Sequence, residues 1–253
     1  MLTNNKIKLI KSLDQKKNRK ESGFFIVEGE KMVQELLQSN FNIAEIFATE
    51  SFFNDNAFAK SIAEISVVSE KELERISHLK TPNKAIALVA LPKPEETKLC
   101  RGLSIALENL QDPGNLGTII RTAAWFGISN IYCTPDTVDV YNPKVIQSTM
   151  GAIFKVNVNY CNLFETINKA KSNAITCFGT RLDGENIYQT TLNNNAVIVM
   201  GNESKGMSSE LSRLMDRNIK IPSYAPPSAD MESLNVSIAT AIVCAEFRRQ
   251  FPK

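Results

Sequence analysis

Short apolar runs alternate with helix-like segments along the first third of the chain. Residues 32–37 place their apolar side chains three to four positions apart, which predicts an amphipathic helix. Ser69 followed by Glu72 forms a capping-box pattern and predicts the start of a second helix. The apolar runs predict four strands, at residues 24–27, 43–48, 65–68 and 85–91. A small α/β domain is therefore expected over residues 1–91.

A polar stretch follows, and the alternation then resumes. Proline is the only apolar side chain in residues 92–98, which predicts a linker over residues 92–102. Six further strands are predicted, at residues 103–107, 131–134, around 156, 174–179, 196–200 and 219–221. Helical segments lie between them, and residues 236–250 form a long final helix. This order predicts a second α/β domain over residues 103–253, with a parallel sheet covered by helices on both faces.

The composition narrows the chemistry. No apolar run approaches the roughly 18 residues of a membrane span, and no secretory signal is visible, so a cytoplasmic protein is expected. His78, expected at the surface, is the single histidine, which rules out a metal site built from several histidines. The five cysteines are widely spaced and never form CxxC, so we expect buried reduced thiols and no metal.

Positive charge is concentrated at the N-terminus although the net charge is only +2. Seven of the first twenty residues are Lys or Arg, against the single acid Asp14. Such a cluster favours contact with a phosphate backbone. A solvated, frayed terminus explains the same pattern, and the charge alone leaves both interpretations open.

Ligands bind such sheets at the carboxyl ends of the strands, so the loops after residues 107, 200 and 221 are candidates for a site. The first loop has turn chemistry at residues 112–115, where Asn115 can cap the next helix. Arg121 follows among apolar neighbours. Its guanidinium therefore needs an anionic partner, either a carboxylate in a salt bridge or a bound phosphate.

The second and third loops lack the signatures of nucleotide-binding sites. Gly206 is followed by Met207, so the Gly-Lys-Ser/Thr of a P-loop is missing, and there is no GxGxxG. Gly201 allows close approach of backbone to a ligand, and Glu203 is the only carboxylate of the second loop. Together the loops offer amides, hydroxyls and one arginine, which suits a group transfer whose chemistry is carried by a cofactor.

These loops resemble, in order, the three signature motifs of the SpoU methyltransferases of the SPOUT superfamily, which are TrmH-like RNA 2′-O-ribose methyltransferases. The matching segments are residues 112–123 (DPGNLGTIIRTA), 199–206 (VMGNESKG), and 221–222 (IP) with 233–237 (SLNVS). Residues 1–91 resemble, less specifically, the RNA-recognition domain that precedes the catalytic domain in the rRNA-modifying branch. One departure is the longer segment 222–231 within the third loop.

The resemblance implies a C-terminal domain with a deep trefoil knot, bound S-adenosyl-L-methionine, and a homodimer formed through the catalytic domain. The residues implied to bind the cofactor are Met200, Gly201, Ile221, Ser233 and Leu234. The residues implied to be catalytic are Asn115, Arg121, Glu203 and Asn235. Arg121 would act either as the base that takes the 2′-hydroxyl proton or as a group that orients phosphate and ribose. Arginine stays protonated to very high pH, which favours orientation.

The expected function is methyl transfer to a ribose 2′-hydroxyl of RNA, with 23S-type rRNA favoured because of the N-terminal domain. A tRNA substrate is the alternative within this class. A non-catalytic RNA-binding protein on the same fold is the alternative from another class.

The final helix carries Ile238, Ala241, Ile242 and Ala245 at helical spacing, together with Val236 and Phe247. This apolar surface favours the homodimer, with burial inside its own domain as the other explanation.

Overall fold

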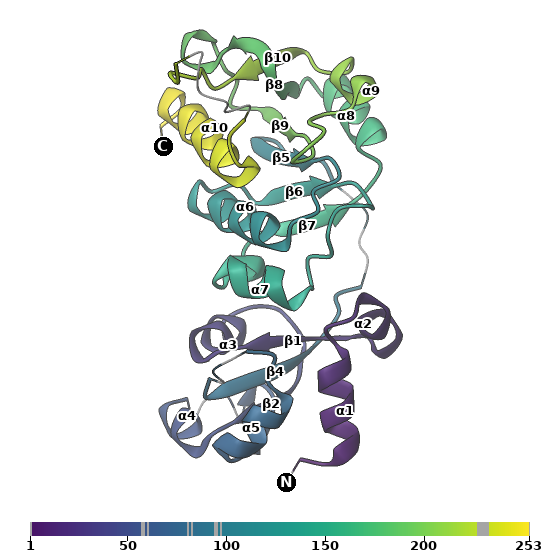
Figure 1. Cartoon of the computed structure of the whole chain (residues 1–253), viewed down its shortest axis with the longest axis vertical. Coiled ribbons are helices and arrows are strands. Elements are labelled where there is room, and N and C mark those ends of the chain that lie inside the picture. Colours follow the sequence, from purple (N-terminus) through teal and green to yellow (C-terminus); the bar gives the residue numbers. More distant parts are fainter. Residues whose placement is uncertain are drawn as a thin grey trace. The chain divides into compact units, whose positions relative to one another are not determined.

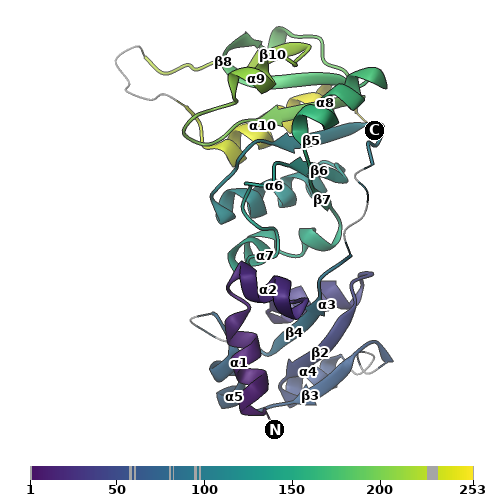
Figure 2. The same ribbon diagram turned by 90° about the vertical axis from the view of Figure 1, so that its right-hand side faces the viewer.

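The computed structural model describes residues 2–56, 59, 61–79, 81, 83–93, 96, 98–226 and 233–252. The chain forms two compact units. The first contains residues 1–95 together with 139–155, and the second contains residues 96–138 together with 156–253. Figures 1 and 2 show the elements of each unit.

The first unit is built on a mixed four-stranded sheet of order β1-β4-β2-β3. The strands are β1 (Phe24–Glu28), β2 (Ile43–Ala48), β3 (Glu64–Val67) and β4 (Ala85–Ala90). Strand β4 runs antiparallel to both neighbours, whereas β2 and β3 are parallel. The helices are α1 (Asn4–Ser12), α2 (Lys16–Ser22), α3 (Glu30–Leu37), α4 (Glu50–Asp55) and α5 (Glu70–Ile76). The four strands, the 32–37 helix and the capping box of Ser69 and Glu72 are confirmed.

The basic N-terminal segment is folded, so the interpretation as a frayed terminus is wrong. Ile10 of α1 and the following Leu13 are fully buried in the core of the first unit. Lys6 Nζ lies 2.5 Å from the buried carboxylate of Glu45, and Lys11 Nζ donates to the Ser77 carbonyl at 2.7 Å. Part of the positive charge therefore holds helices in place and is not free for phosphate.

Arg19 makes the most buried of these contacts, with its side chain only 2% exposed. It donates to the carbonyls of Leu13 and Asp14 at 2.7 and 2.8 Å, which closes the turn between α1 and α2. Its Nε and Nη2 also donate to Asp139 Oδ2 at 3.1 and 2.5 Å. Since a buried guanidinium needs this anion, Arg19 holds the segment that begins at Asp139 within the first unit.

Two further contacts attach the same segment, which contains α7 (Pro143–Thr149) and the short helix η2 (Ala152–Phe154). The rings of Tyr141 and Phe25 have centroids 4.6 Å apart, and Lys155 forms a 2.8 Å ion pair with Glu35. The predicted division placed all of 103–253 in one domain. The structure differs because residues 139–155 are packed and paired with the first unit.

The second unit is an all-parallel six-stranded sheet of order β10-β8-β9-β5-β6-β7. Its strands are β5 (Leu103–Leu107), β6 (Asn130–Cys133), β7 (Asn157–Tyr160), β8 (Thr176–Asn186), β9 (Ala196–Met200) and β10 (Arg217–Lys220). Its helices are α6 (Pro113–Trp125), α8 (Leu163–Ser172), α9 (Ser209–Ser212) and α10 (Val236–Gln250), with the short η3 (Ile187–Gln189). Helices α6 and α10 cover one face, and α8 and α9 lie on the other (Figures 1 and 2). The predicted parallel sheet with helices on both faces is confirmed.

Helices α6 and α10 lie side by side with both N-termini at the same end. At the start of the pair, Asn235 Nδ2 donates to Asn115 Oδ1 at 2.9 Å. At the other end, Arg248 donates to the carbonyls of Phe126 and Gly127 at 2.7 and 3.2 Å. The two helices thus bring the first and third loops to one edge of the sheet.

The thiols match the expectation in part. Cys133, Cys177 and Cys244 are buried, whereas Cys161 is half-buried and Cys100 is exposed. Burial raises the pKa of both Cys177 and Cys244 to about 12, so these two stay protonated at neutral pH.

No helix in the described residues is both long and apolar enough to cross a membrane.

His78 was expected at the surface, but its side chain is only 19% exposed. The main-chain N–H of His78 and the Ser77 hydroxyl donate to Glu28 at 2.9 and 2.7 Å, and His78 Nδ1 lies 3.1 Å from the same carboxylate. Its Nε2 lies 3.3 Å from the Lys11 carbonyl, so both ring nitrogens face acceptors. The bond with Glu28 raises the pKa of His78 above 6.5, against the opposing effect of burial. Burial acts to raise the pKa of Glu28, but the bonds from His78 and Ser77 outweigh it and the pKa is lowered.

This pair predicts a pH-dependent stability. The contribution of His78 is complete below its unfolded pKa of 6.5 and is lost as the pH rises through its higher folded pKa. The contribution of Glu28 is present above 4.5 and is lost as the pH falls through its lower folded pKa. We expect the melting temperature of the wild type to fall relative to His78→Asn between pH 6 and pH 8. Parallel melting profiles for the two proteins would contradict this assignment.

Candidate functional site

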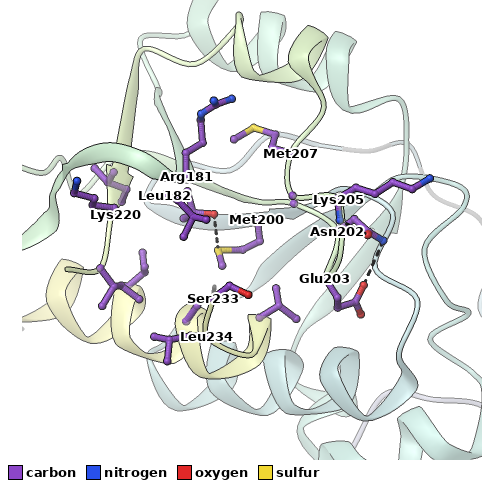
Figure 3. A pocket seen from close by; sticks show the side chains of 18 of the residues that line it. Arg181, Leu182, Met200, Asn202, Glu203, Lys205, Met207, Lys220, Ser233 and Leu234 are labelled. Atoms are coloured by element: carbon purple, nitrogen blue, oxygen red, sulfur yellow. Dashed lines mark hydrogen bonds between the residues drawn. The ribbon is translucent and has the colours of Figure 1, made fainter. Parts of the chain in front are cut away.

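The loops that follow β9 and β10 border a cavity of about 460 Å³ in the second unit, and no residue of the first loop, after β5, lines it. Its walls come from the end of β8, the whole second loop, the end of β10, and the start of α10. The lining residues are 180–183, 200–207, 219–221, 233, 234, 236, 239 and 243. Figure 3 shows Glu203 and Lys205 on one side of this pocket and Lys220 at the opposite end.

The contribution of β8 was not predicted, because the strand runs to Asn186 and not to residue 179. Thr180 Oγ1 donates to the Val199 carbonyl at 3.0 Å and contacts Met200 Sδ at 3.6 Å. Arg181 donates to both carboxylate oxygens of Asp183 at 2.8 and 2.9 Å. The spacing of Phe178, Thr180 and Leu182 at every second position was a signal for the longer strand.

The second loop is a tight hairpin. The main chains of Asn202 and Gly206 pair in both directions at 2.9 Å, and Asn202 Oδ1 accepts from the N–H groups of Ser204 and Lys205 at 3.0 Å each. Gly201 lies directly beneath this pairing. A Cβ there would lie 2.2 Å from the Gly206 carbonyl carbon and from the Met207 nitrogen. Only glycine fits at this position without moving the backbone of the loop.

The first loop is held by the second. Glu203 accepts main-chain hydrogen bonds from Asp112 at 3.0 Å and from Gln111 at 3.3 Å. Asn202 Nδ2 donates to the carbonyl of Asn109 at 2.7 Å, and Asn109 has a positive φ of 54°. Asparagine tolerates this left-handed conformation better than most residues.

The prediction that Asn115 caps α6 is wrong. Asp112 is the N-cap, and its side chain accepts from the Asn115 N–H at 2.8 Å. Asn115 therefore lies inside the first helical turn, where its own side chain is free to bond with other loops. Asn235 is the N-cap of α10, since its Oδ1 accepts from the N–H groups of Ser237 and Ile238.

Three of the four predicted catalytic side chains form one hydrogen-bonded chain. Asn115 Nδ2 donates to Glu203 Oε1 at 3.4 Å, and Asn115 Oδ1 accepts from Asn235 Nδ2 at 2.9 Å. Each residue comes from a different loop. The chain therefore connects the first, second and third loops at the edge of the pocket.

Arg121 is not part of this chain. It is exposed, and among the described residues it makes no hydrogen bond or ion pair and does not line the pocket. It shares the outer face of α6 with Thr118 and Trp125, whereas Ile119 and Ile120 face the core. The salt bridge considered from sequence is thus not seen in the described part of the chain.

All five residues predicted to bind the cofactor line the same pocket. They are Met200, Gly201, Ile221, Ser233 and Leu234. Of the longer segment 222–231, residues 227–231 lie outside the described residues. Within the described chain, no group of three or more His, Cys, Asp or Glu side chains could hold a metal ion. The pocket offers main-chain groups, apolar walls, the Asn202 amide and a few charged side chains, which suits an organic ligand.

Comparison with known proteins places this geometry in a family. The SpoU rRNA methylase family matches residues 102–245, and an MRM3-like substrate binding domain matches residues 4–87. The chain belongs to the SpoU rRNA methylase family.

Relatives resemble this chain over almost its whole length. The 23S rRNA (guanosine(2553)-2′-O)-methyltransferase RlmP of Bacillus subtilis is 31% identical, with 97% of this chain and 96% of that protein covered. A TrmH-family structure from Porphyromonas gingivalis is 35% identical with a TM-score of 0.88, covering 99% of both chains. An AdoMet-bound rRNA methyltransferase from Sinorhizobium meliloti is 28% identical with a TM-score of 0.87, covering 100% of this chain and 97% of that one.

The packing around Gly201 predicts the effect of one methyl group. Gly201→Ala should push residues 206 and 207 away, break the pairing with Asn202, and destabilise the second unit by roughly 1–3 kcal/mol. Gly206→Asn is the control, because Gly206 has open space and a φ of 67° that asparagine tolerates. Denaturant unfolding should separate the two variants. Equal stability of the two would show that space at Gly201 is not limiting.

Proposed function

We propose that this protein transfers a methyl group from S-adenosyl-L-methionine to a ribose 2′-hydroxyl of RNA, with 23S-type rRNA as the substrate. The observation that carries the proposal is the chain of Glu203, Asn115 and Asn235, which joins three loops at the edge of one pocket. Relatives support it: RlmP is named as a 23S rRNA 2′-O-methyltransferase, and the Sinorhizobium meliloti structure contains AdoMet.

The pocket fits the cofactor. Its volume of about 460 Å³ lies within the usual range for small-molecule sites, and its walls include Met200, Ile219 and Leu234. When bound, the cofactor supplies an electrophilic methyl group on a sulfonium. The protein then has to bind and orient the two substrates and to let the 2′-hydroxyl proton leave to solvent, so a site with no histidine or cysteine nucleophile is sufficient.

A homodimer is part of the proposal. Ile238 is 54% exposed and Ala245 is exposed, with the half-buried Ala241 and Ile242 between them on the outer face of α10. Trp125 of the adjacent α6 is 85% exposed. An outward apolar stripe that includes a tryptophan is typical of an interface. Val236 and Phe247, also considered for the interface, are buried inside their own unit. The trefoil knot implied by the resemblance stays a prediction.

Arg121 lies on this same outer face, one turn from Trp125. In the proposed dimer it therefore sits at the interface and serves the ribose held at the pocket of the partner subunit. A guanidinium remains protonated, so its role is to hold an RNA phosphate and to stabilise the oxygen that loses its proton. A side chain with no described partner in its own subunit fits such a role.

The first unit supplies RNA affinity in this proposal. Lys8, Lys16 and Lys20 are exposed on or beside α1 and α2 and make no ion pair within the described residues. The match to an MRM3-like substrate binding domain over residues 4–87 supports this assignment. Deleting residues 1–91 would not test the RNA affinity of the first unit alone. The deletion also removes Arg19 and Phe25, which hold residues 139–155.

The direct test is transfer of a labelled methyl group from S-adenosyl-L-methionine to separated rRNA and tRNA, followed by mapping of the modified nucleotide. We expect label on a ribose 2′-oxygen of 23S-type rRNA. Label only on tRNA would assign the alternative substrate. RNA binding with no transfer to either RNA would favour the non-catalytic alternative.

The same assay tests Arg121. Arg121→Ala should lower the rate by about 10²–10³-fold while affinity for S-adenosyl-L-homocysteine stays unchanged, because the lost contact is to RNA. Arg121→Lys should be nearly as slow, since it keeps the charge but loses the planar fork.

Mixed dimers of Arg121→Ala with Glu203→Gln should recover about half of the wild-type activity per dimer if Arg121 serves the partner's pocket. In each mixed dimer, one pocket then combines an intact Glu203 with an intact Arg121 from the other subunit. Mixed dimers without activity would mean that Arg121 acts on its own pocket.

A further inference from the structure

Glu108, directly after β5, bonds to both ends of the second loop although it does not line the described pocket. Its main-chain N–H donates to the Met200 carbonyl at 3.0 Å, where the loop begins. Its carboxylate accepts from the Ser208 N–H at 2.7 Å and from the Ser208 hydroxyl at 2.5 Å, where the loop ends. A single residue therefore bonds to both ends of the loop formed by residues 200–208.

The loop that Glu108 closes forms a continuous part of the pocket wall. Residues 200–207 all line the cavity, and Met207, next to Ser208, is buried. The other ties of this hairpin are the pairing of Asn202 with Gly206, the bond from Asn202 to Asn109, and the bonds that Glu203 accepts from the first loop. The pairing lies inside the loop, and the bond to Asn109 holds its beginning. Two hydrogen bonds from Ser208 tie its end to Glu108.

Ser208 is a relay between Glu108 and the next helix. Its hydroxyl donates to Glu108 and accepts from the Leu211 N–H at 3.2 Å, so it caps α9. A carboxylate can accept both Ser208 donors at once, whereas an amide presents one oxygen and a competing donor. Replacement by glutamine therefore loses one of the two charge-assisted bonds without changing the size of the side chain.

We propose that Glu108 is a positioning residue for the methyl-transfer site: it fixes the second loop in the shape that binds S-adenosyl-L-methionine. This inference rests on the proposed function. Together with Glu203, it makes the bracing reciprocal. Glu203 extends from the second loop to the main chain of the first, and Glu108 extends from the start of the first loop to the end of the second.

The test compares Glu108→Gln with Glu210→Gln, whose carboxylate is exposed two residues beyond Ser208. We expect Glu108→Gln to bind S-adenosyl-L-homocysteine about tenfold more weakly in calorimetry. The KM for S-adenosyl-L-methionine should rise by a similar factor while kcat at saturation stays within about twofold. Affinity for RNA should not change, and Glu210→Gln should match the wild type in every measurement.

Hydrogen exchange separates positioning from general destabilisation. In Glu108→Gln, faster exchange should be confined to residues 201–208, with β5 and β9 as protected as in the wild type. Faster exchange throughout the sheet, or unchanged ligand affinity, would overturn the proposal. If Glu108→Gln does not fold, Ser208→Ala removes only the hydroxyl contacts and should weaken ligand binding about threefold, with Ser209→Ala as its control.

The outcome also separates this inference from the proposed function. A wild-type protein that binds neither S-adenosyl-L-methionine nor S-adenosyl-L-homocysteine would sink the proposed function. The exchange measurement on residues 201–208 would still report whether Glu108 holds the loop. A wild type that binds both ligands, with Glu108→Gln binding as tightly, would sink only the role of Glu108.

Discussion

The arrangement of the three loops at the site depends on the hydrogen bonds that the Glu203 carboxylate accepts. This carboxylate accepts main-chain hydrogen bonds from the first loop and a side-chain bond from Asn115, which in turn accepts from Asn235. Three chain segments far apart in sequence are thus tied by bonds that need no bound ligand. A pocket arranged before its ligand arrives loses less conformational freedom on binding. The polar side chains of this site hold the three loops in place, and any chemistry at the site depends on the resulting shape of the loops.

Elements with a strong hydrophobic period could be predicted from the sequence. The bounds of α10 and of the central strands β5 and β9 agree with the residues expected. The pattern was weak where polar residues form ordered structure. Helices α1 and α2 are rich in lysine and contain few buried residues, with Ile10 in α1 and Arg19 in α2. Tertiary contacts made by Lys6 and Arg19 decide that these helices form, and such contacts have no local signature.

Several residues named from the sequence lie together in the structure, but their arrangement could not be predicted. The motif order identified Asn115, Glu203 and Asn235 together, and they do meet. Spacing could not show that Asp112 takes the cap and leaves the Asn115 side chain free. It also could not show that Arg121 points away from the pocket, because the direction of a helical side chain depends on which face packs on the sheet. Glu108 was overlooked because its partner, Ser208, is 100 residues away in sequence.

The placement of residues 139–155 in the first unit has a consequence for synthesis on the ribosome. The strands β5 and β6 leave the ribosome before Asp139, yet the first unit lacks the partner of Arg19 until that residue has emerged. Domains usually fold one after the other from the N-terminus. The first unit is complete only after residues 139–155 have been synthesised, when β5 and β6 of the second unit have already left the ribosome. The two units therefore mature in an interleaved order, although nearly all of the first is encoded ahead of the second.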